Sequence, residues 1–344
     1  MNSNTKAPQV SVVILNWNGK KFLDGCLSSL TKQTYANLEI ILVDNASSDG
    51  SVDGIADRFN NIVLIKNSAN LGFGGGNNVG IKAANGQYVM VLNNDTELDP
   101  KCIAELVKVI ERDPTVGACA TKILSYYDHN VIDVAGIIIY PDGSARGRGR
   151  LEKASDNYTK EEEIFFGSDC AVLYRKKMLD EIGLYDADFF AHHDETDLGM
   201  RAHWRGWRCI YVPTAVVYHM YSASFGAYSP LKAFLVERNR AFVAIKNFPI
   251  PMLLISPFFT VKRLLLQAYG VISKKGASGK FTEKSPKFQL ILIFIKAYAS
   301  VLLNLPLYLK KRKEIMKNRK IKNSEFYDLF RRYSISASEL ALKD

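Results

Sequence analysis

Three polar residues follow the end of an apolar segment and could together bind a metal ion. Residues 88–92 have the apolar character of a strand covered on both faces, and Asn93, Asn94 and Asp95 come directly after them. In open α/β sheets, ligands bind at the carboxyl ends of the strands. One carboxylate with two amides suits Mg²⁺ or Mn²⁺, which take their remaining ligands from phosphate and water. A simple turn is the alternative interpretation, because the same residue types are common in turns.

Two further apolar segments also end in polar residues. Asn16 follows residues 10–15, and Asp44 and Asn45 follow residues 38–43. Parallel strands end at one edge of a sheet, so these side chains are expected near Asp95. Asp44 could accept hydrogen bonds from the base or ribose of a nucleotide. Its alternative role is to cap a helix.

A glycine-rich stretch at residues 67–78 invites comparison with a dinucleotide-binding loop. It differs from that fingerprint, because Asn77 stands at the third glycine position and the stretch follows the third predicted strand. Small residues at the start of a helix would still allow a nucleotide-linked ligand to approach, with Asn70, Gly74 and Asn77 as candidate contacts. The alternative is a loop in which glycine has only a steric role.

A second acidic cluster, at residues 192–198, could supply a general base. Its carboxylates repel one another, so at least one pKa should rise, which suits proton abstraction by Asp194 or Glu195. Asp197 is expected to pair with Arg201 four residues later and to have a structural role. Acidic residues also favour helix N-termini without any catalytic function. His219 at a later strand end is either a core histidine or a further metal ligand.

The elements that must position these residues alternate between strands and helices. Strands are predicted at 10–15, 38–43, 62–65 and 87–92. Between them lie a helix at 20–31, a short helix capped by residues 47–50 and ending at Phe59, and a third helix that includes residues 79–84. This alternation predicts an α/β domain with a mainly parallel central sheet. Later strands are expected at 116–123, 164–174, 209–212 and 215–218, and helices at 100–111, 176–182 and 195–204. Residues 140–143 are typical of a hairpin turn, and residues 146–150 of a mobile basic loop.

The chain has a net charge of +10, and the C-terminal part accounts for it. Residues 229–344 carry 23 Lys and Arg against seven Asp and Glu, whereas residues 1–228 carry 22 against 28. Helices are predicted at 231–247, 250–272 and 288–309. The basic, apolar-rich composition favours an anionic membrane surface as partner and argues against nucleic acid, since no base-stacking module accompanies the charge.

The predicted tail leaves three interpretations open. Lys262 and Arg263 interrupt the first long apolar segment, which favours helices lying in the membrane interface with basic side chains reaching water. A membrane-inserted hairpin and a surface for homo-oligomerisation are the alternatives. The polar N-terminus indicates no signal peptide, and five scattered cysteines indicate reduced thiols. We therefore predict a cytoplasmic protein held peripherally on the inner face of the cell membrane.

Taken together, these segments resemble glycosyltransferase family 2, the inverting transferases of GT-A fold, over about residues 10–247. The resemblance rests on the following motifs: VVILNWN at 12–18, VDNASSDG at 43–50, NxGFGGGNN at 70–78, LNNDT at 92–96, GLYDxxFF at 183–190 and DExDL at 194–198. Within the family, the chain is most similar to rhamnosyltransferase-type enzymes of bacterial surface polysaccharide synthesis.

The resemblance implies a role for each matched residue. Asp44 would contact the base of a nucleotide-diphosphate sugar, for which dTDP and UDP are favoured, and Asp95 would bind the metal with Asn93 at the other end of the Asp-x-Asp motif. Glu195 would be the base, with Asp194 as the alternative, acting on a hydroxyl of a glycan or lipid-linked acceptor. His219 matches a histidine of the metal or diphosphate site.

Three departures from the family pattern affect this interpretation. Asn93 replaces the first Asp of the motif, the order of Asp194 and Glu195 is reversed, and Asp169 stands where relatives often have glycine in the acceptor-side loop. Trp204 is a further candidate on the acceptor side. A nucleotidyltransferase is the rival enzyme class, and a non-catalytic sugar-nucleotide binding or scaffold protein is the rival outside enzymes.

Overall fold

The computed structural model describes residues 7–59, 61–155, 157–220, 229–284 and 286–343. The chain forms two compact units, each assembled from separate segments. The first comprises Met1–Gly136, Gly147–Phe190 and Trp207–Ser224, and the second comprises Ile137–Arg146, Ala191–Gly206 and Phe225–Asp344. Residues 137–146 and 191–206 thus pack with the C-terminal helices. The division predicted from sequence, a domain at 1–228 and a basic, apolar-rich tail at 229–344, stays a prediction. The predicted domain end near residue 225 lies outside the described residues.

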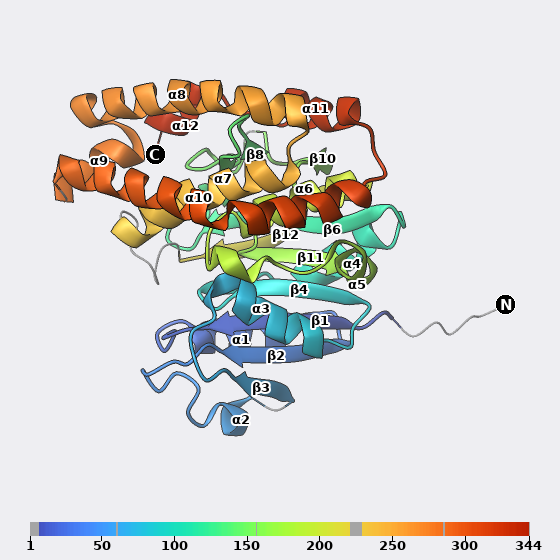
Figure 1. Cartoon of the computed structure of the whole chain (residues 1–344). Helices are drawn as coiled ribbons and strands as arrows, with labels where there is room; N and C mark the ends of the chain where they lie inside the picture. Colours follow the sequence, from blue (N-terminus) through green and yellow to red (C-terminus); the bar gives the residue numbers. More distant parts are fainter. Residues whose placement is uncertain (1–6, 60, 156, 221–228, 285, 344) are drawn as a thin grey trace. The chain divides into compact units, whose positions relative to one another are not determined.

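The first unit is built on a mixed sheet with a parallel N-terminal half (Figure 1). Strands β1 (Val10–Asn16), β2 (Leu38–Asp44), β3 (Ile62–Lys66) and β4 (Tyr88–Asn93) pair in parallel in the order β4-β1-β2-β3. Strand β11 (Ala171–Arg175) runs antiparallel to β4 and to β6 (Val116–Ser125), and β6 is parallel to β12 (Arg208–His219). The prediction of a mainly parallel α/β sheet is confirmed, with β11 as the antiparallel insertion.

Short strands complete the sheet and bring its later residues to the same region. β10 (Glu162–Ile164) and β5 (Thr96–Leu98) pair with β12, and β7 (Ile132–Val134) pairs with β6. The two late strands predicted from sequence form one strand, β12, with a register shift between Val212 and Val216. Because His219 at the end of β12 pairs with Thr96, it lies next to Asp95.

The helices of the first unit are α1 (Leu23–Thr31), α2 (Ile55–Arg58), α3 (Gly72–Ala83), α4 (Cys102–Ile110), α5 (Lys176–Ile182) and the 3-10 helix η1 (Ala187–Phe189). The predicted helix that includes residues 79–84 is α3, which begins at Gly72 within the glycine-rich stretch. A Cβ atom on Gly76 would lie 2.4 Å from Leu15, and one on Gly80 would lie 2.4 Å from Val13. These glycines therefore let α3 pack closely on β1, so Gly76, within the glycine-rich stretch, has a packing role.

The second unit is helical apart from the hairpin β8 (Ile137–Ile139) and β9 (Ala145–Gly147), which forms at the predicted turn. Its helices are α6 (Asp194–Trp204), α7 (Pro230–Asn247), α8 (Ile250–Ser273), α9 (Gly276–Lys284), α10 (Lys287–Lys317), α11 (Asn323–Arg332) and α12 (Ala337–Leu342). Figure 1 shows α8 and α10 as the longest rods of this unit, joined through α9.

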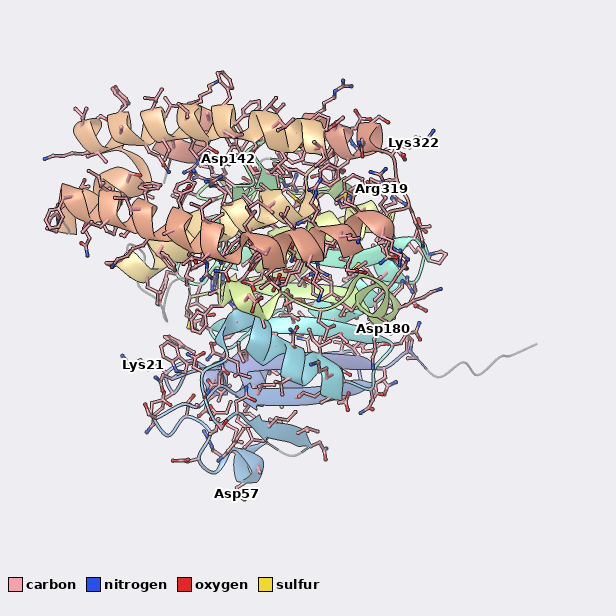
Figure 2. The ribbon with its side chains drawn as sticks, in the orientation of Figure 1. Lys21, Asp57, Asp142, Asp180, Arg319 and Lys322 are labelled. Carbon is pink, nitrogen blue, oxygen red and sulfur yellow. The ribbon has the colours of Figure 1, made fainter. Side chains whose placement is uncertain are left out.

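A buried ion network ties α7, α8 and the hairpin together. Arg263 of α8 donates to Asp142 (Nε–Oδ2 2.7 Å) and to Glu237 of α7 (Nη2–Oε2 2.9 Å). Arg240 also pairs with Glu237, and Asp142, labelled in Figure 2, is fully buried. The predicted orientation of Arg263 toward water is therefore wrong, because this side chain lies inside the protein with two carboxylate partners.

The polarity of α8 is reversed relative to an ordinary surface helix. Its buried face carries Ser256, Thr260 and Arg263, whereas Leu254 and Phe258 are 75% and 70% exposed. Helix α10 shares only the apolar outer face, with Leu303 83% exposed, because most of its buried residues, such as Ile293 and Val301, are apolar as well. Both helices are long and apolar enough, by length and composition, to cross a membrane. A polar face turned toward protein and an apolar face turned outward are typical of a helix that contacts lipid.

Candidate active site

The ends of β1, β2 and β4 are joined through side-chain hydrogen bonds. The Asn16 amide donates to Asp44 (Nδ2–Oδ1 3.2 Å) and to Ser51 Oγ (2.8 Å), and it accepts from Asn94 (Nδ2–Oδ1 2.8 Å). Ser47 donates its backbone N–H to the second oxygen of Asp44 (3.3 Å). The predicted convergence of these strand ends is thus seen in the first unit. Asn16 is fully buried, so its contribution is to hold the neighbouring loops.

Asn45 organises the loop that leads into α3. Its amide donates to Asn70 (Nδ2–Oδ1 2.8 Å) and to the Gly72 carbonyl (3.1 Å), and its oxygen accepts from Asn67 and from the Leu71 N–H. Asn45 thus connects the end of β2 to the start of α3 through hydrogen bonds, and Asn70 lies in the loop that precedes α3.

Other residues of the predicted donor site differ in how accessible they are. Asn77 and Gly74 are buried within α3, and Asn77 donates to the Phe73 carbonyl (3.0 Å). Asn93 is partly exposed, and its side chain forms no hydrogen bond within the described residues. Asp44 is only 4% exposed, so Asn93 and Asn70 are the partly exposed residues of this set.

Asp95 and His219 form the predicted metal pair, and two further residues support them. His219 Nε2 lies 3.4 Å from Asp95 Oδ1, while Nδ1 of the same ring lies 2.6 Å from Asp133 Oδ2. Arg150 in turn pairs with Asp133 (Nη1–Oδ1 2.7 Å). Since Nδ1 binds Asp133, the ring directs Nε2 toward Asp95. Arg150 was expected in a mobile loop, and that prediction is wrong because its ion pair with Asp133 holds the residue in place.

The chemistry of this pair fits a divalent cation. Burial lowers the pKa of His219, but Cys170, Asp133 and Asp95 around the ring raise it, and the net pKa lies well above 6.5. A divalent cation would bring the positive charge that this environment favours, with His219 and Asp95 as the residues that would hold it. No cluster of three or more His, Cys, Asp or Glu residues able to hold a metal occurs in the described part of the chain. Two protein ligands suit an ion that takes its other ligands from a diphosphate and water.

The predicted base lies at the N-terminus of α6 in the second unit, after an unusual turn. His192 and His193 both have positive φ, at 70° and 67°, which is rare for non-glycine residues. Asn239 of α7 is fully buried and donates to the carbonyls of Ala191 (2.8 Å) and His192 (2.9 Å). Such strain persists only where surrounding contacts enforce it, and Asn239 supplies two of them.

Asp194 and Glu195 differ in burial. Asp194 is 2% exposed, whereas Glu195 is partly exposed. Withdrawal from solvent raises the pKa of the Glu195 carboxyl, as a general base requires. Burial also lowers the pKa of His192 to about 4 and that of His193 to about 3, so both rings are neutral at pH 7.

Asp197 has the structural role expected for it. It pairs with Arg201 (2.9 Å) one turn along α6 and with Lys246 (2.9 Å) of α7. Burial alone would raise the pKa of Asp197, but Lys246 and Arg201 hold it well below its usual range.

The two acceptor-side candidates are structural in their own units. The Asp169 carboxylate accepts hydrogen bonds from the hydroxyls of Tyr174 and Tyr185 (2.7 Å each) and is buried. Trp204 is fully buried, donates to the Asn247 carbonyl (2.9 Å) and stacks on Phe326 at 4.2 Å. The expectation that Trp204 contacts an acceptor is wrong, because its ring lies in the core between α6, α7 and α11.

Sequence reasoning missed Asp133, Arg150 and Asn239 as site residues. Asp133 lies in a three-residue strand, and no motif marks it. Asn239 lies between two arginines in an ordinary helix. Asn239 is identified by its full burial, which is a property of the tertiary structure and is not visible in the sequence.

Comparison with known proteins identifies relatives of the chain. The family model for glycosyl transferase family 2 matches residues 11–183. An N-acetylglucosaminyl-diphospho-decaprenol L-rhamnosyltransferase of Mycobacterium tuberculosis is 27% identical over 242 residues, covering 62% of this chain and 77% of that protein. The glycosyltransferase GlyG of Streptococcus pneumoniae is 33% identical over 129 residues, covering 36% of this chain and 41% of that protein.

Solved structures with a similar fold support the GT-A assignment. A mannosyltransferase from Pyrobaculum calidifontis, solved with GDP-Man and Mn²⁺, superposes with a TM-score of 0.54 at 16% identity and covers 91% of this chain and 86% of that one. GalNAc-T7, solved with UDP, GalNAc and Mn²⁺, gives a TM-score of 0.61 at 19% identity over 88% of this chain and 58% of that one. The predicted GT-A type α/β fold is confirmed.

Proposed function

Because the chain belongs to glycosyl transferase family 2, we propose that this glycosyltransferase inverts the anomeric carbon of its donor sugar and joins it to a hydroxyl of a glycan or lipid-linked acceptor. The observation that carries the proposal is the Asp95–His219 pair, which lies at the end of β4 in the sheet whose neighbouring strands end at Asn16 and Asp44. A strand edge of this kind suits a nucleotide diphosphate.

In the donor site, we assign each residue a separate task. Asp44 accepts hydrogen bonds from the uracil or thymine base or the ribose, and dTDP- and UDP-sugars are the favoured donors. Asn93 meets the diphosphate or its metal, and Asp95 with His219 holds Mg²⁺ or Mn²⁺. When bound, the cation supplies charge neutralisation of the departing diphosphate. The Mn²⁺ seen in the two similar structures supports a divalent ion here.

In the reaction, Glu195 removes the proton of the acceptor hydroxyl as the oxygen attacks. The new bond forms between that oxygen and the anomeric carbon, on the face opposite the nucleotide, and the bond to the diphosphate oxygen breaks. The raised pKa of Glu195 supports this role. Asn239 keeps the turn before Glu195 in the geometry that the base requires.

The named relative supports a proposal for the substrates. A rhamnosyl donor and a diphospho-polyprenyl acceptor are what the Mycobacterium relative's name describes, so we propose rhamnose transfer to a lipid-linked glycan for surface polysaccharide. A lipid-linked acceptor would require the enzyme to work at the cytoplasmic face of the membrane. The outward apolar faces of α8 and α10 support peripheral attachment there, and homo-oligomerisation through these faces is the alternative.

The test combines two variants of the predicted base. Glu195→Gln should lower transfer by about 100-fold or more, the usual contribution of a general base, while nucleotide-sugar binding stays unchanged. Asp194→Asn is the matched comparison and should have the smaller effect. If Asp194→Asn alone abolishes transfer, the base is Asp194. If neither variant changes the rate, the assignment of the base to this turn is refuted.

A further inference from the structure

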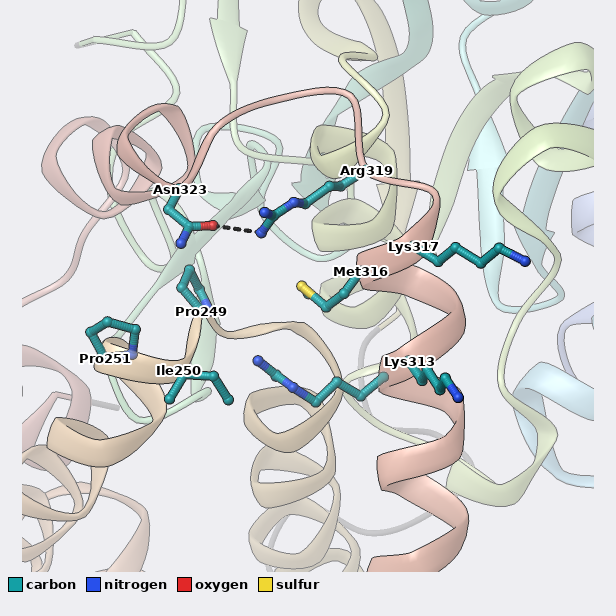
Figure 3. Close-up of a pocket in the computed structure, with 9 residues that line it drawn as sticks. Pro249, Ile250, Pro251, Lys313, Met316, Lys317, Arg319 and Asn323 are labelled. Atoms are coloured by element: carbon teal, nitrogen blue, oxygen red, sulfur yellow. Dashed lines mark hydrogen bonds between the residues drawn. The ribbon is translucent and has the colours of Figure 1, made fainter.

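A basic pocket opens in the second unit, at the start of α8 and the end of α10. Its volume is about 490 Å³, and none of its lining residues is acidic. The residues that line it are Pro249, Ile250, Pro251, Arg312, Lys313, Met316, Lys317, Arg319 and Asn323. Figure 3 shows Arg319 directed toward Asn323 on one side, whereas Lys313 and Lys317 point away from Pro249 and form the rim.

Arg312 carries a buried charge, and no acidic residue in the described part of the chain pairs with it. It is 9% exposed, and its one hydrogen bond within the described residues is to the Ile245 carbonyl (2.9 Å). A guanidinium has five N–H donors, and a buried cation without a counter-ion is costly. Burial lowers the pKa of Arg312 for this reason. Arg201, Arg240 and Arg263, the other buried arginines among the described residues of this unit, each pair with a carboxylate, and no such pair is seen for Arg312 there.

Two neighbouring features also favour an anion. Helix α8 has 24 residues, and its N-cap residue forms no side-chain hydrogen bond. Residues 249–251 at its N-terminus line the pocket, so the positive end of the helix dipole lies at the pocket. Arg319 donates to Asn323 (Nη1–Oδ1 2.9 Å) and keeps further N–H groups available for an oxyanion. Arginine forks of this kind match the oxygens of a phosphate.

We propose that this basic pocket binds the phosphate group of an anionic phospholipid, with Arg312 and Arg319 as its contacts. The adjoining surface identifies a lipid as the source of the phosphate. Ile250 lines the pocket and is 55% exposed, and Leu254, one turn along α8, is 75% exposed. Leu309, one turn before Lys313 on α10, is also exposed. A headgroup in the pocket would place its acyl chains along these apolar faces.

The experiment uses the full-length protein and vesicles of phosphatidylcholine with or without phosphatidylglycerol. Arg312→Gln and Arg319→Gln should each weaken binding to the anionic vesicles by about tenfold or more, as expected for loss of a charged hydrogen bond. Lys262→Gln is the matched control, because it removes one exposed charge from α8 outside the pocket and should cost no more than about fivefold.

A soluble probe gives the second measurement. Glycerol 3-phosphate should raise the Tm of the wild type and of Lys262→Gln but not that of the two pocket variants. Arg319 is exposed, so its variant keeps the test valid if Arg312→Gln does not fold. The proposal is overturned by equal effects of all three substitutions, by equal binding to neutral and anionic vesicles, or by stabilisation with glycerol 3-phosphate without vesicle binding.

This inference rests on the membrane-attachment part of the proposed function and on no catalytic residue. Transfer to a soluble acceptor should therefore be unchanged in the pocket variants. If the wild-type protein transfers no sugar at all, that result counts against the transferase proposal and leaves the pocket proposal intact.

Discussion

Replacing Asp133 by Asn should weaken metal binding by Asp95 and His219, although Asp133 is not itself one of the proposed metal ligands. Its carboxylate lies 2.6 Å from His219 Nδ1, and both side chains are about nine-tenths buried, at 9% and 10% exposure. This contact sets which ring nitrogen faces Asp95. A hydrogen bond to a charged group contributes about 1.5–3 kcal/mol, and loss of such support typically lowers metal affinity by about 10- to 100-fold. Asparagine keeps the shape and one acceptor, so we expect a value near the lower end, about tenfold.

The assay is the Mn²⁺ concentration that gives half-maximal hydrolysis of the sugar nucleotide, measured for wild type and Asp133→Asn. Asp113→Asn is the matched control, because Asp113 pairs with Arg208 at 2.8 Å on the partly exposed surface of the same unit. That pair should contribute little. An unchanged Mn²⁺ requirement in a folded Asp133→Asn protein would refute the role given to the Asp133–His219 contact.

Three further predictions test the second unit. Asn239→Ala leaves the carbonyls of Ala191 and His192 without their donor, so kcat for transfer should fall while KM for the donor changes little; a KM effect alone would contradict a positioning role. Because the pKa of Glu195 is raised and the base must be ionised, kcat/KM should increase with pH through a pKa above the ordinary glutamate value of 4.5, and a profile flat from pH 4.5 upward would count against Glu195. Glu237→Gln leaves Arg240 and Arg263 with one carboxylate between them, so the free energy of unfolding should fall by about 3–5 kcal/mol, measured by chemical denaturation; a loss under about 1 kcal/mol would show that Asp142 alone suffices.

The parallel strands and their polar ends could be predicted because both signals are local. Asn16, Asp44 and Asn93 each stand directly after a run of apolar residues, and the run and its end are visible in the sequence. The pairing of Asp197 with Arg201 could be predicted for the same reason, since residues four apart on a helix are neighbours. The free, buried state of all five cysteines also agrees with their scattered positions.

The glycine-rich stretch and Trp204 show where local reasoning fails. Glycines at 76 and 80 suggest flexibility or ligand access by type, yet close packing on β1 is what requires them. An aromatic residue near an acidic motif suggests a substrate contact, yet Trp204 stacks on Phe326, more than a hundred residues away in the chain. Packing partners of this kind depend on the whole fold.

The sequence by itself determined the class of the fold, the family and the residues at the strand ends, because hydrophobic periodicity and turn chemistry act over a few neighbouring positions. Only the tertiary structure decided that Asp133 orients His219 and that Asn239 holds the turn before Glu195. It also decided that Arg263 has carboxylate partners, whereas Arg312 has none among the residues that the structure describes. Each of these depends on groups brought together from distant segments. Burial then sets the energy of each contact, and the residues adjacent in the sequence do not determine whether a side chain is buried.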